Sequence, residues 1–377
     1  MKIDNLVLND KTWQYSSQGL SSSEIPDIVF IFGDTDIIKD KSIYKAIREK
    51  FPKSHLIGSS SSGNILGCEI SKFPIVASAV KFESSKVEVQ SIKYHQGESL
   101  QDLSYELVNN LSKDGLKHIF LLSDGLNING SDLVKGVNLA ATNVSVTGGL
   151  AGDGGRFQET YVICNDEPRA SIISAIGFYG ENLVISSGCF GGWSEFGTKR
   201  LITKSKANVL YEIDNEPALD FYKRYLGNYA TGLPNSGLRF PLSIKKDDND
   251  SEVIRTLLGI DEESKSITFA GDIPEGYYAK LMMPDADALI QGAGRAANEI
   301  VIANDKPALG LVVSCVGRKL VLGQLIDEEL EEIGETLGKN INLIGFYSYG
   351  EIAPFEVNKL ECKLHNQTMT LTAIYEN

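Results

Sequence analysis

The sequence predicts an α/β protein, with α+β elements, built as two mixed-sheet domains whose helices pack on the sheets. Short apolar runs typical of buried strands alternate with amphipathic helical segments. A chain of 377 residues is also too long for one ordinary hydrophobic core. We expect a lead-in over residues 1–25, one domain over 26–200 and a second over 201–377. A weak internal pseudo-repeat, described below, completes the prediction.

The first half of the chain reads as strands and helices in alternation. Asp27–Phe32, Lys39–Phe51 and His55–Gly58 read as strand, helix and strand, which predicts a parallel pair with a right-handed crossover. Residues 1–25 are polar and predict an irregular lead-in or one edge strand. The other expected elements are strands Pro74–Phe82, Lys86–Tyr94, Ile119–Leu122 and Val144–Val146, helices Ser99–Asp114 and Asp132–Thr142, and an antiparallel meander of Tyr161–Cys164, Ala170–Tyr179 and Leu183–Phe190.

The composition of the chain changes after Gly191. A helix over Pro217–Leu226 is expected to be the first element of the second domain. The last strand, Thr368–Tyr375, alternates polar and apolar residues and predicts an antiparallel edge strand. The remaining expected elements are strands Ile267–Phe269, Tyr278–Met282, Leu309–Cys315 and Asn342–Ile344, and helices Asp285–Ile302 and Leu325–Leu337.

Charge and composition exclude several classes of protein. The formal charge of −14 argues against binding to nucleic acid or to an anionic membrane surface. No run approaches the roughly 18 apolar residues of a membrane helix, and the polar first 23 residues do not resemble a signal peptide. Five dispersed cysteines without a Cys-x-x-Cys pair suit reduced thiols. We therefore expect a cytoplasmic protein.

A glycine pattern recurs at three strand ends. Leu56-Ile-Gly58 followed by Gly63 has the spacing of Leu343-Ile-Gly345 followed by Gly350, and Val146-Thr-Gly-Gly149 with Gly152 is a looser match. An internal duplication would explain the pattern, and so would coincidence among 36 glycines, because glycine often ends strands. Such turns would gather along one rim of the molecule.

Asn342–Pro354 is the first candidate for a binding site. Two glycines, Gly345 and Gly350, are expected to frame a turn that carries Tyr347 and is followed by Glu351. Aromatic walls beside a glycine turn and one carboxylate suit a small polar ligand. A structural turn packed by tyrosines has the same local sequence.

Three further residues carry possible chemistry. Asp153 follows a strand on a glycine turn, where it suits either a ligand amine or an Asx-type turn. Arg318 either holds a carboxylate with its fork of donors or is a surface arginine. Cys315, three residues before it, is either a thiolate activated by the guanidinium or a buried thiol.

Two other patterns favour structural roles. Gly292-Ala-Gly-Arg-Ala-Ala297 matches a dinucleotide-binding fingerprint in spacing but lies inside a predicted helix, which favours close helix packing. The histidines stand at predicted strand ends, apart from one another and from carboxylate clusters; one of them would suffice as an axial haem ligand.

The motifs together resemble the FIST proteins. They are, in order, Thr147-Gly-Gly-Leu-Ala-Gly-Asp153, Phe190-Gly-Gly-Trp193, Ser314-Cys-Val-Gly-Arg318, Gly345-Phe-Tyr-Ser-Tyr-Gly-Glu-Ile-Ala-Pro354 and His365-Asn-Gln-Thr-Met-Thr-Leu-Thr. The resemblance covers about Pro26 to Glu376, and it implies a FIST N-type domain over 26–200 and a FIST C-type domain over 201–377.

The resemblance implies a non-catalytic sensory protein that binds a small ligand, such as an amino acid or a derivative. No output region follows the last matched strand, so the signal is expected to pass to a separate histidine kinase or cyclic-di-GMP enzyme. One branch of the family implies an alternative, a haem-binding nitric-oxide sensor; an enzyme with a Cys315 nucleophile is a third hypothesis.

We expect the ligand, a carboxylate or zwitterion, in a cleft between the domains. Arg318 would hold its carboxylate, Glu351 or Asp153 its amine, and Trp193 and Tyr347 its apolar part. The full set of expected ligand-binding residues is Asp153, Trp193, Cys315, Arg318, Tyr347, Gly350 and Glu351.

Overall fold

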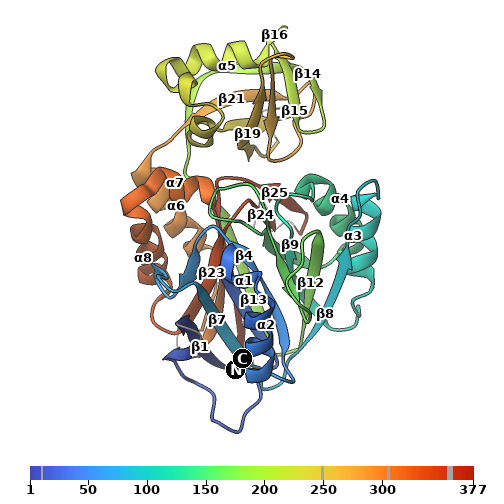
Figure 1. Ribbon diagram of the computed structural model, residues 1–377, viewed down its shortest axis with the longest axis vertical. Coiled ribbons are helices and arrows are strands. Elements are labelled where there is room, and N and C mark those ends of the chain that lie inside the picture. Colours follow the sequence, from blue (N-terminus) through green and yellow to red (C-terminus); the bar gives the residue numbers. More distant parts are fainter. Residues whose placement is uncertain (10–11, 248–249, 304–305, 355–359) are drawn as a thin grey trace.

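The protein consists of a large lower body and a smaller upper lobe (Figure 1). The computed structural model describes residues 1–9, 12–247, 250–303, 306–354 and 360–377. The described residues between 194 and 283 form the upper lobe, and the other described residues belong to the body, where the two chain ends lie close together at the base. The predicted α/β class is confirmed.

Three six-stranded sheets build the body. The first sheet has the order β11 (Val162–Cys164), β4 (His55–Ser61), β3 (Ile28–Asp34), β7 (Ile75–Lys81), β1 (Lys2–Asn9) and β2 (Thr12–Ser17). The second has the order β25 (Cys362–His365), β24 (Gly350–Pro354), β10 (Ser145–Leu150), β9 (Leu116–Ser123), β12 (Ile172–Tyr179) and β8 (Lys86–Lys93). The third has the order β13 (Leu183–Phe190), β26 (Met369–Glu376), β22 (Ala308–Cys315), β23 (Ile341–Ser348), β5 (Asn64–Leu66) and β6 (Glu69–Ile70).

Each sheet is organised around the same strand–helix–strand unit. The units are β3–α2–β4, β9–α4–β10 and β22–α8–β23, with helices α2 (Lys41–Lys50), α4 (Gly130–Ala140) and α8 (Ile326–Leu337). In every unit the two strands pair in parallel, as expected for the first of them. The body also contains α1 (Thr35–Ile38), α3 (Leu100–Asn109), α6 (Ala286–Asn298), α7 (Val316–Leu322) and the short 3₁₀ turn η3 (Gly323–Leu325).

The recurrent glycines occupy equivalent places in these three units. Each lies in the middle of the second strand, opposite a residue of the first: the pairs are Gly58 with Ile31, Gly148 with Leu121 and Gly345 with Val312. A Cβ atom at these glycines would lie 1.8, 2.0 and 1.9 Å from the carbonyl oxygen opposite. The expected turn at Gly345 is therefore wrong: this glycine is needed inside a strand, where two backbones approach closely.

The units also exchange strands in a cycle. Strand β5, which follows β4, pairs with β23; strand β11, which follows β10, pairs with β4; and strand β24, which follows β23, pairs with β10. Where the three second strands end, a ring of backbone hydrogen bonds joins them: Ser62 N to Tyr347 O at 2.8 Å, Gly152 N to Ser60 O at 3.1 Å and Tyr349 N to Leu150 O at 3.1 Å. The pseudo-repeat is thus a threefold one, and we call this meeting point the hub.

One apolar core lies between the three sheets. Phe30 of the first sheet meets Phe120 of the second edge to face, with ring centroids 6.2 Å apart. Phe32 stacks on Phe346 of the third sheet at 4.7 Å. These side chains are at most 1% exposed, so the faces turned toward one another are excluded from water.

The upper lobe has its own sheet and core. Tyr222 and Phe269 are fully buried between the sheet and helix α5 (Ala218–Leu226). The strand order is β18 (Val253–Arg255), β17 (Leu242–Lys245), β21 (Tyr278–Met283), β14 (Ser194–Lys206), β15 (Val209–Ile213), β20 (Ser266–Phe269) and β19 (Leu257–Asp261), with β16 (Glu216–Pro217) beside β15 and the 3₁₀ turns η1 (Gly227–Gly232) and η2 (Asn235–Arg239) next to α5. The chain passes between the upper lobe and the body through residues 191–193 and 284–285.

Three expectations about strand pairing are wrong. The lead-in forms two strands, and β1 lies inside the first sheet, between β7 and β2. Buried Asp4 of β1 accepts hydrogen bonds from the backbone N–H groups of Gly19 and Leu20. The three strands of the expected meander lie in three different sheets. The last strand, β26, is antiparallel but central, between β13 and β22. Strands from both sides of residue 200 share two of the sheets, and the division of the chain at 200 stays a prediction.

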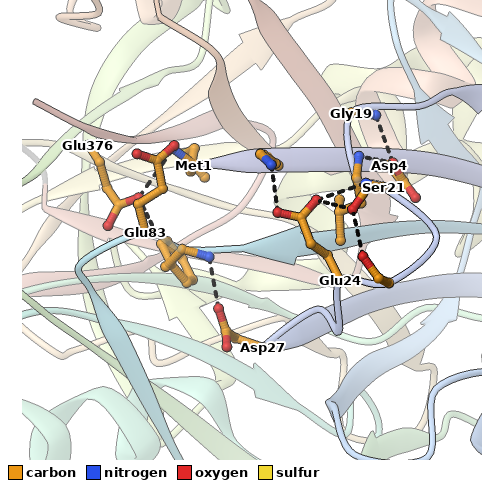
Figure 2. A network of polar contacts seen from close by, with 12 residues as sticks. Met1, Asp4, Gly19, Ser21, Glu24, Asp27, Glu83 and Glu376 are labelled. Carbon is orange, nitrogen blue, oxygen red and sulfur yellow. Dashed lines mark hydrogen bonds and ion pairs between the residues drawn. The ribbon is translucent and has the colours of Figure 1, made fainter.

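The two chain ends are joined by a buried ionic contact (Figure 2). The N-terminal ammonium of Met1 lies 3.2 Å from Glu376, whose side chain is 4% exposed. The same carboxylate accepts hydrogen bonds from the backbone N–H groups of Glu83, Ser84 and Ser85 at 2.8 to 2.9 Å. Burial raises the pKa of Glu376, but these donors outweigh it and lower the pKa to about 2.

We expect Glu376→Gln to destabilise the protein at neutral pH by about 3 kcal/mol, because four charge-compensating donors lose their anion. The folded-state pKa lies below the ordinary value of 4.5, so this stability is present above pH 4.5 and is lost as the pH falls toward 2. Urea denaturation at pH 7 and pH 3 checks this. Exposed Glu49→Gln is the control; an equal and small effect of both substitutions would contradict the account.

Candidate functional site

A cavity of about 430 Å³ lies between the upper lobe and the body. The first connecting segment, residues 191–193, forms one wall. The lining residues from the body are Cys189, Phe190, Gly191, Gly192, Trp193, Ala288, Gln291, Arg295, His365 and Thr368, and those from the upper lobe are Ser194, Glu252, Ile254 and Met282. The cavity therefore occupies the junction through which the two lobes are linked.

The sequence places Trp193 at this junction through the glycines before it. Gly192 has φ +87°, and a Cβ atom there would lie 2.2 Å from the carbonyl oxygen of Ala288 in α6. This close approach fixes the segment against the helix. The indole N–H of Trp193 then donates to the carbonyl oxygen of Gln367 at 3.0 Å. Trp193 is the one expected ligand-binding residue that lines the cavity, among those described.

Opposite charges face the cavity from the two lobes. Arg295 of α6 lies over the ring of Phe190, 5.1 Å from its centroid, and forms no ion pair with a described carboxylate. Glu252 of the upper lobe accepts a hydrogen bond from Ser243 at 2.7 Å. A cation held by an aromatic face and a carboxylate on the other wall are suited to a ligand that carries both charges.

Arg318, Tyr347 and Cys315 lie behind the cavity wall. Arg318 is 0% exposed and forms an ion pair with Glu329 of α8 at 2.8 Å. Its guanidinium also donates to the carbonyl oxygens of Gly191 and Leu289, and the hydroxyl of Tyr347 donates to Glu329 at 2.7 Å. Arg318 thus fixes Gly191, a residue of the cavity wall. A ligand carboxylate would have to share Arg318 with Glu329, so a ligand contact for it stays a prediction.

Glu351 supports the same wall from another side. Its carboxylate accepts hydrogen bonds from the hydroxyl of Ser348 at 2.5 Å and from the backbone N–H and hydroxyl of Thr368 at 3.1 and 3.0 Å. Thr368 lines the cavity. Burial raises the pKa of Glu351 to about 7, which places its titration near neutral pH.

We expect Glu351→Gln to remove one component of the pH dependence of stability. The folded-state pKa lies above the ordinary value of 4.5, so this component is fully present below pH 4.5 and is lost as the pH rises through 7. Its size is on the order of 3 kcal/mol. Denaturation midpoints between pH 5 and 8 measure it, with exposed Glu328→Gln as the control. Identical pH profiles for the wild type and Glu351→Gln would contradict this role.

The other expected site residues lie at the hub or beside it. Asp153 accepts hydrogen bonds from the backbone N–H groups of residues 156–159 at 2.7 to 3.1 Å and from the hydroxyl of Tyr349, so it has the geometry of an Asx-type cap. Gly350 begins β24 and packs against Leu364. Their contacts with a ligand stay predictions.

The pKa values of the Cys189 and Cys315 thiols are raised, whereas a nucleophilic cysteine requires a lowered pKa. Burial raises the pKa of Cys189, in the cavity wall, to about 11. The pKa of Cys315 is raised still further by burial, and its residue is 2% exposed. Protonated thiols are poor nucleophiles, so this geometry gives no support to an enzyme based on Cys315.

Two of the four histidines, His118 and His365, are held in hydrogen bonds that do not suit an axial haem ligand. His118 is fully buried, with its two ring nitrogens bonded to Ser145 and Thr147. His365 lines the cavity, but its Nε2 donates to the carbonyl oxygen of Ala353 at 3.0 Å, and burial lowers its pKa to about 4. An iron ligand would have to replace these bonds.

Sequence reasoning missed Arg295, Glu252, Gln291 and His365 as cavity residues. Arg295 stands inside the small-residue segment that was assigned to helix packing, and that packing is confirmed: a Cβ atom at Gly294 would lie 2.5 Å from Glu332 of α8. The same segment therefore packs one face on α8 and presents Arg295 to the cavity from another. An arginine interrupting a run of small residues was the available signal.

Comparison with known proteins gives a family and one relative. Residues 27–216 match the FIST N domain, and residues 218–354 match the FIST C domain. An uncharacterized protein of Methanocaldococcus jannaschii is 23% identical, over 93% of this chain and 73% of its own length. The crystal structure of cyanuric acid hydrolase from A. caulinodans aligns over 93% of this chain and 90% of its own, with 7% identity and a TM-score of 0.37.

Among the described residues, none of the helices has both the length and the apolar character needed to cross a bilayer.

Proposed function

This chain belongs to the FIST family, and from that premise we propose that it is a non-catalytic sensor of a small zwitterion, such as an amino acid or a derivative. FIST domains are sensory domains that bind small ligands in signalling proteins. The observation that carries the proposal is the cavity between the lobes, with Arg295 on one wall and Glu252 on the other.

Each charge of the ligand lies opposite a residue of opposite charge on a cavity wall. Arg295 binds the carboxylate, since a guanidinium offers a planar pair of donors. Glu252 binds the amine, and Trp193 with Met282 contacts the apolar part. Arg318 and Glu351 hold Gly191 and Thr368 in place behind these contacts. They are positioning residues in this proposal.

Binding in this cavity changes the balance between arrangements of the two lobes. A ligand that touches both lobes favours the arrangement in which all its contacts are made, and it shifts the equilibrium by its difference in affinity. Arg255 of the upper lobe donates to Leu364 of the body at 3.0 Å, and Lys135 of the body pairs with Asp272 at 2.9 Å. These contacts are among those that a lobe movement alters. The signal then passes to a separate histidine kinase or cyclic-di-GMP enzyme.

Thermal-shift screening with amino acids and their amine and carboxylate analogues tests the proposal. We expect a zwitterionic ligand to raise the melting temperature by mass action. Arg295→Gln and Glu252→Gln are expected to weaken its affinity by roughly tenfold or more each, because a charged contact is lost. Arg239→Gln, an exposed arginine outside the cavity, is the control. Absence of any hit, or equal affinity in all variants, contradicts the proposal.

A further inference from the structure

A second cavity, of about 320 Å³, also lies between the two lobes. We call the cavity that holds Arg295 and Glu252 the first cavity. The second cavity is lined from the body by Gly125, Leu126, Asn127, Ile128, Asn129, Gly130, Leu150, Phe157, Tyr349 and Leu364, and from the upper lobe by Asn208, Leu258, Phe269, Ala270 and Gly271. None of these residues lines the first cavity, so the second is separate from the site of the proposed function.

The side chains around the second cavity carry no charge. Within the described part of the chain, its lining contains no lysine, arginine, histidine, aspartate or glutamate. The first cavity, in contrast, has Arg295 and Glu252 on its walls. An ionised ligand in the second cavity would leave water without gaining a counter-charge, which is costly. This lining therefore suits an uncharged molecule, bound mainly by apolar contacts.

An aromatic pair forms one wall of the second cavity. The ring of Phe157 stacks on that of Tyr349, with centroids 4.4 Å apart and planes 12° apart. Phe157 has φ +54°, a conformation that bulky residues rarely adopt and that is common where a ligand is held. Asp153 keeps both residues in place: it accepts a hydrogen bond from the backbone N–H of Phe157 at 2.9 Å and another from the hydroxyl of Tyr349. The glycine turn around Asp153 thus fixes two stacked rings at the cavity.

The upper lobe contributes an exposed leucine that stands at a β-bulge. Leu257 and Gly259 of β19 pair with consecutive residues of β20, so Leu258 between them is an extra residue. Bulges are frequent next to functional sites, where they redirect a side chain. Leu258 is 42% exposed at the cavity, whereas Leu257 is buried in the core of the lobe. A ligand that covers Leu258 removes apolar surface from water, which favours binding.

Two asparagines can recognise a polar group on the ligand. Nδ2 of Asn208, in the upper lobe, donates to the carbonyl oxygen of Phe269 at 2.8 Å. Nδ2 of Asn127, in the body, donates to Asp124 at 2.9 Å. These bonds orient the two amides and leave the Oδ1 atom of each as the group that can accept an N–H or O–H from a ligand.

We propose that the second cavity binds a small uncharged aromatic molecule, such as an indole or a phenol. Its ring lies between the stacked pair of Phe157 and Tyr349 in the body and Leu258 in the upper lobe, since aromatic rings pack well on one another and on apolar side chains. Its N–H or O–H donates to an asparagine amide oxygen. The cavity volume is at the small end of ligand pockets and suits one or two fused rings. Because the molecule contacts both lobes, it favours the arrangement in which they form this cavity.

Ligand-observed NMR titration of the full chain with indole tests the proposal. We expect a dissociation constant below about 2 mM, the range open to a ligand of this size. Leu258→Ser and Phe157→Asn are each expected to weaken binding by about fivefold or more, because each removes apolar contact area. Asparagine tolerates a positive φ, so Phe157→Asn removes the ring and keeps the backbone. Leu201→Ser, at another exposed leucine in a strand of the upper lobe, should leave the affinity unchanged.

A wild-type dissociation constant above about 2 mM overturns the proposal. So does an affinity that Leu258→Ser and Leu201→Ser change equally; both leucines are exposed, so this comparison does not depend on whether Phe157→Asn folds.

A charged probe tests the assignment to uncharged molecules. In the Arg295→Gln variant, which lacks the cation of the first cavity, indole-3-acetate is expected to bind at least about tenfold more weakly than indole. Equal or tighter binding of indole-3-acetate in that variant overturns the assignment. Indole has neither charge of the zwitterion proposed for the first cavity, so each proposal can fail without the other.

Discussion

Replacing Glu329 with glutamine should lower the free energy of unfolding by about 3–5 kcal/mol, because it leaves a buried guanidinium without its counter-ion. Arg318 and Glu329 are both 0% exposed. The carboxylate also accepts hydrogen bonds from Tyr347 and, at 3.4 Å, from Ser314. A glutamine amide keeps the shape but presents N–H donors to groups that are themselves donors.

Urea denaturation of Glu329→Gln beside Glu328→Gln measures this effect. Glu328 is the neighbouring residue of α8 and is exposed, so its substitution should change the unfolding free energy by less than about 0.5 kcal/mol. A loss below about 1 kcal/mol in Glu329→Gln would show that the pair does not organise the wall.

A single methyl group at Gly345 should destabilise the protein by about 3 kcal/mol or more. The added Cβ atom would lie 1.9 Å from the carbonyl oxygen of Val312, which belongs to the paired strand and cannot rotate away. Gly345→Ala therefore separates β22 from β23, the strands that carry Cys315 and Tyr347.

Gly259→Ala is the matched control for Gly345→Ala. Gly259 also lies in a strand, but there the nearest atom to a new Cβ would be 4.0 Å away. Its substitution should be neutral or stabilising by up to about 1 kcal/mol. Comparable destabilisation by the two substitutions in thermal or urea unfolding would contradict the close approach at Gly345.

The sequence allowed the elements to be predicted better than their partners. Apolar runs identified strands such as β3 and β22, because a strand buried on two faces has few polar residues. The sequence did not show that β5, β11 and β24 pair with strands of other units, since an exchanged strand has the same composition as one that pairs within its own unit. The threefold relation was visible in the glycines at 58, 148 and 345, but their reason became clear only from the backbone atoms opposite them.

The residues that support the cavity wall from behind were easier to predict from the sequence than the residues that line the cavity. Arg318 and Glu351 stand in recognisable motifs, and the structure places them one residue behind the cavity wall, bonded to Gly191 and Thr368. Glu252 and Arg295 lie on the wall, from opposite lobes. Local sequence carries no information about which distant segments will face each other across a cavity, and so this pair was missed.

The most direct measurement of the central claim is a structure of the full chain soaked or co-crystallised with the zwitterion that gives the largest thermal shift. The account predicts the ligand between the lobes, with its carboxylate on Arg295, its amine on Glu252 and its apolar part against Trp193. A ligand bound elsewhere, or bound between the lobes without contact to either Arg295 or Glu252, would contradict it.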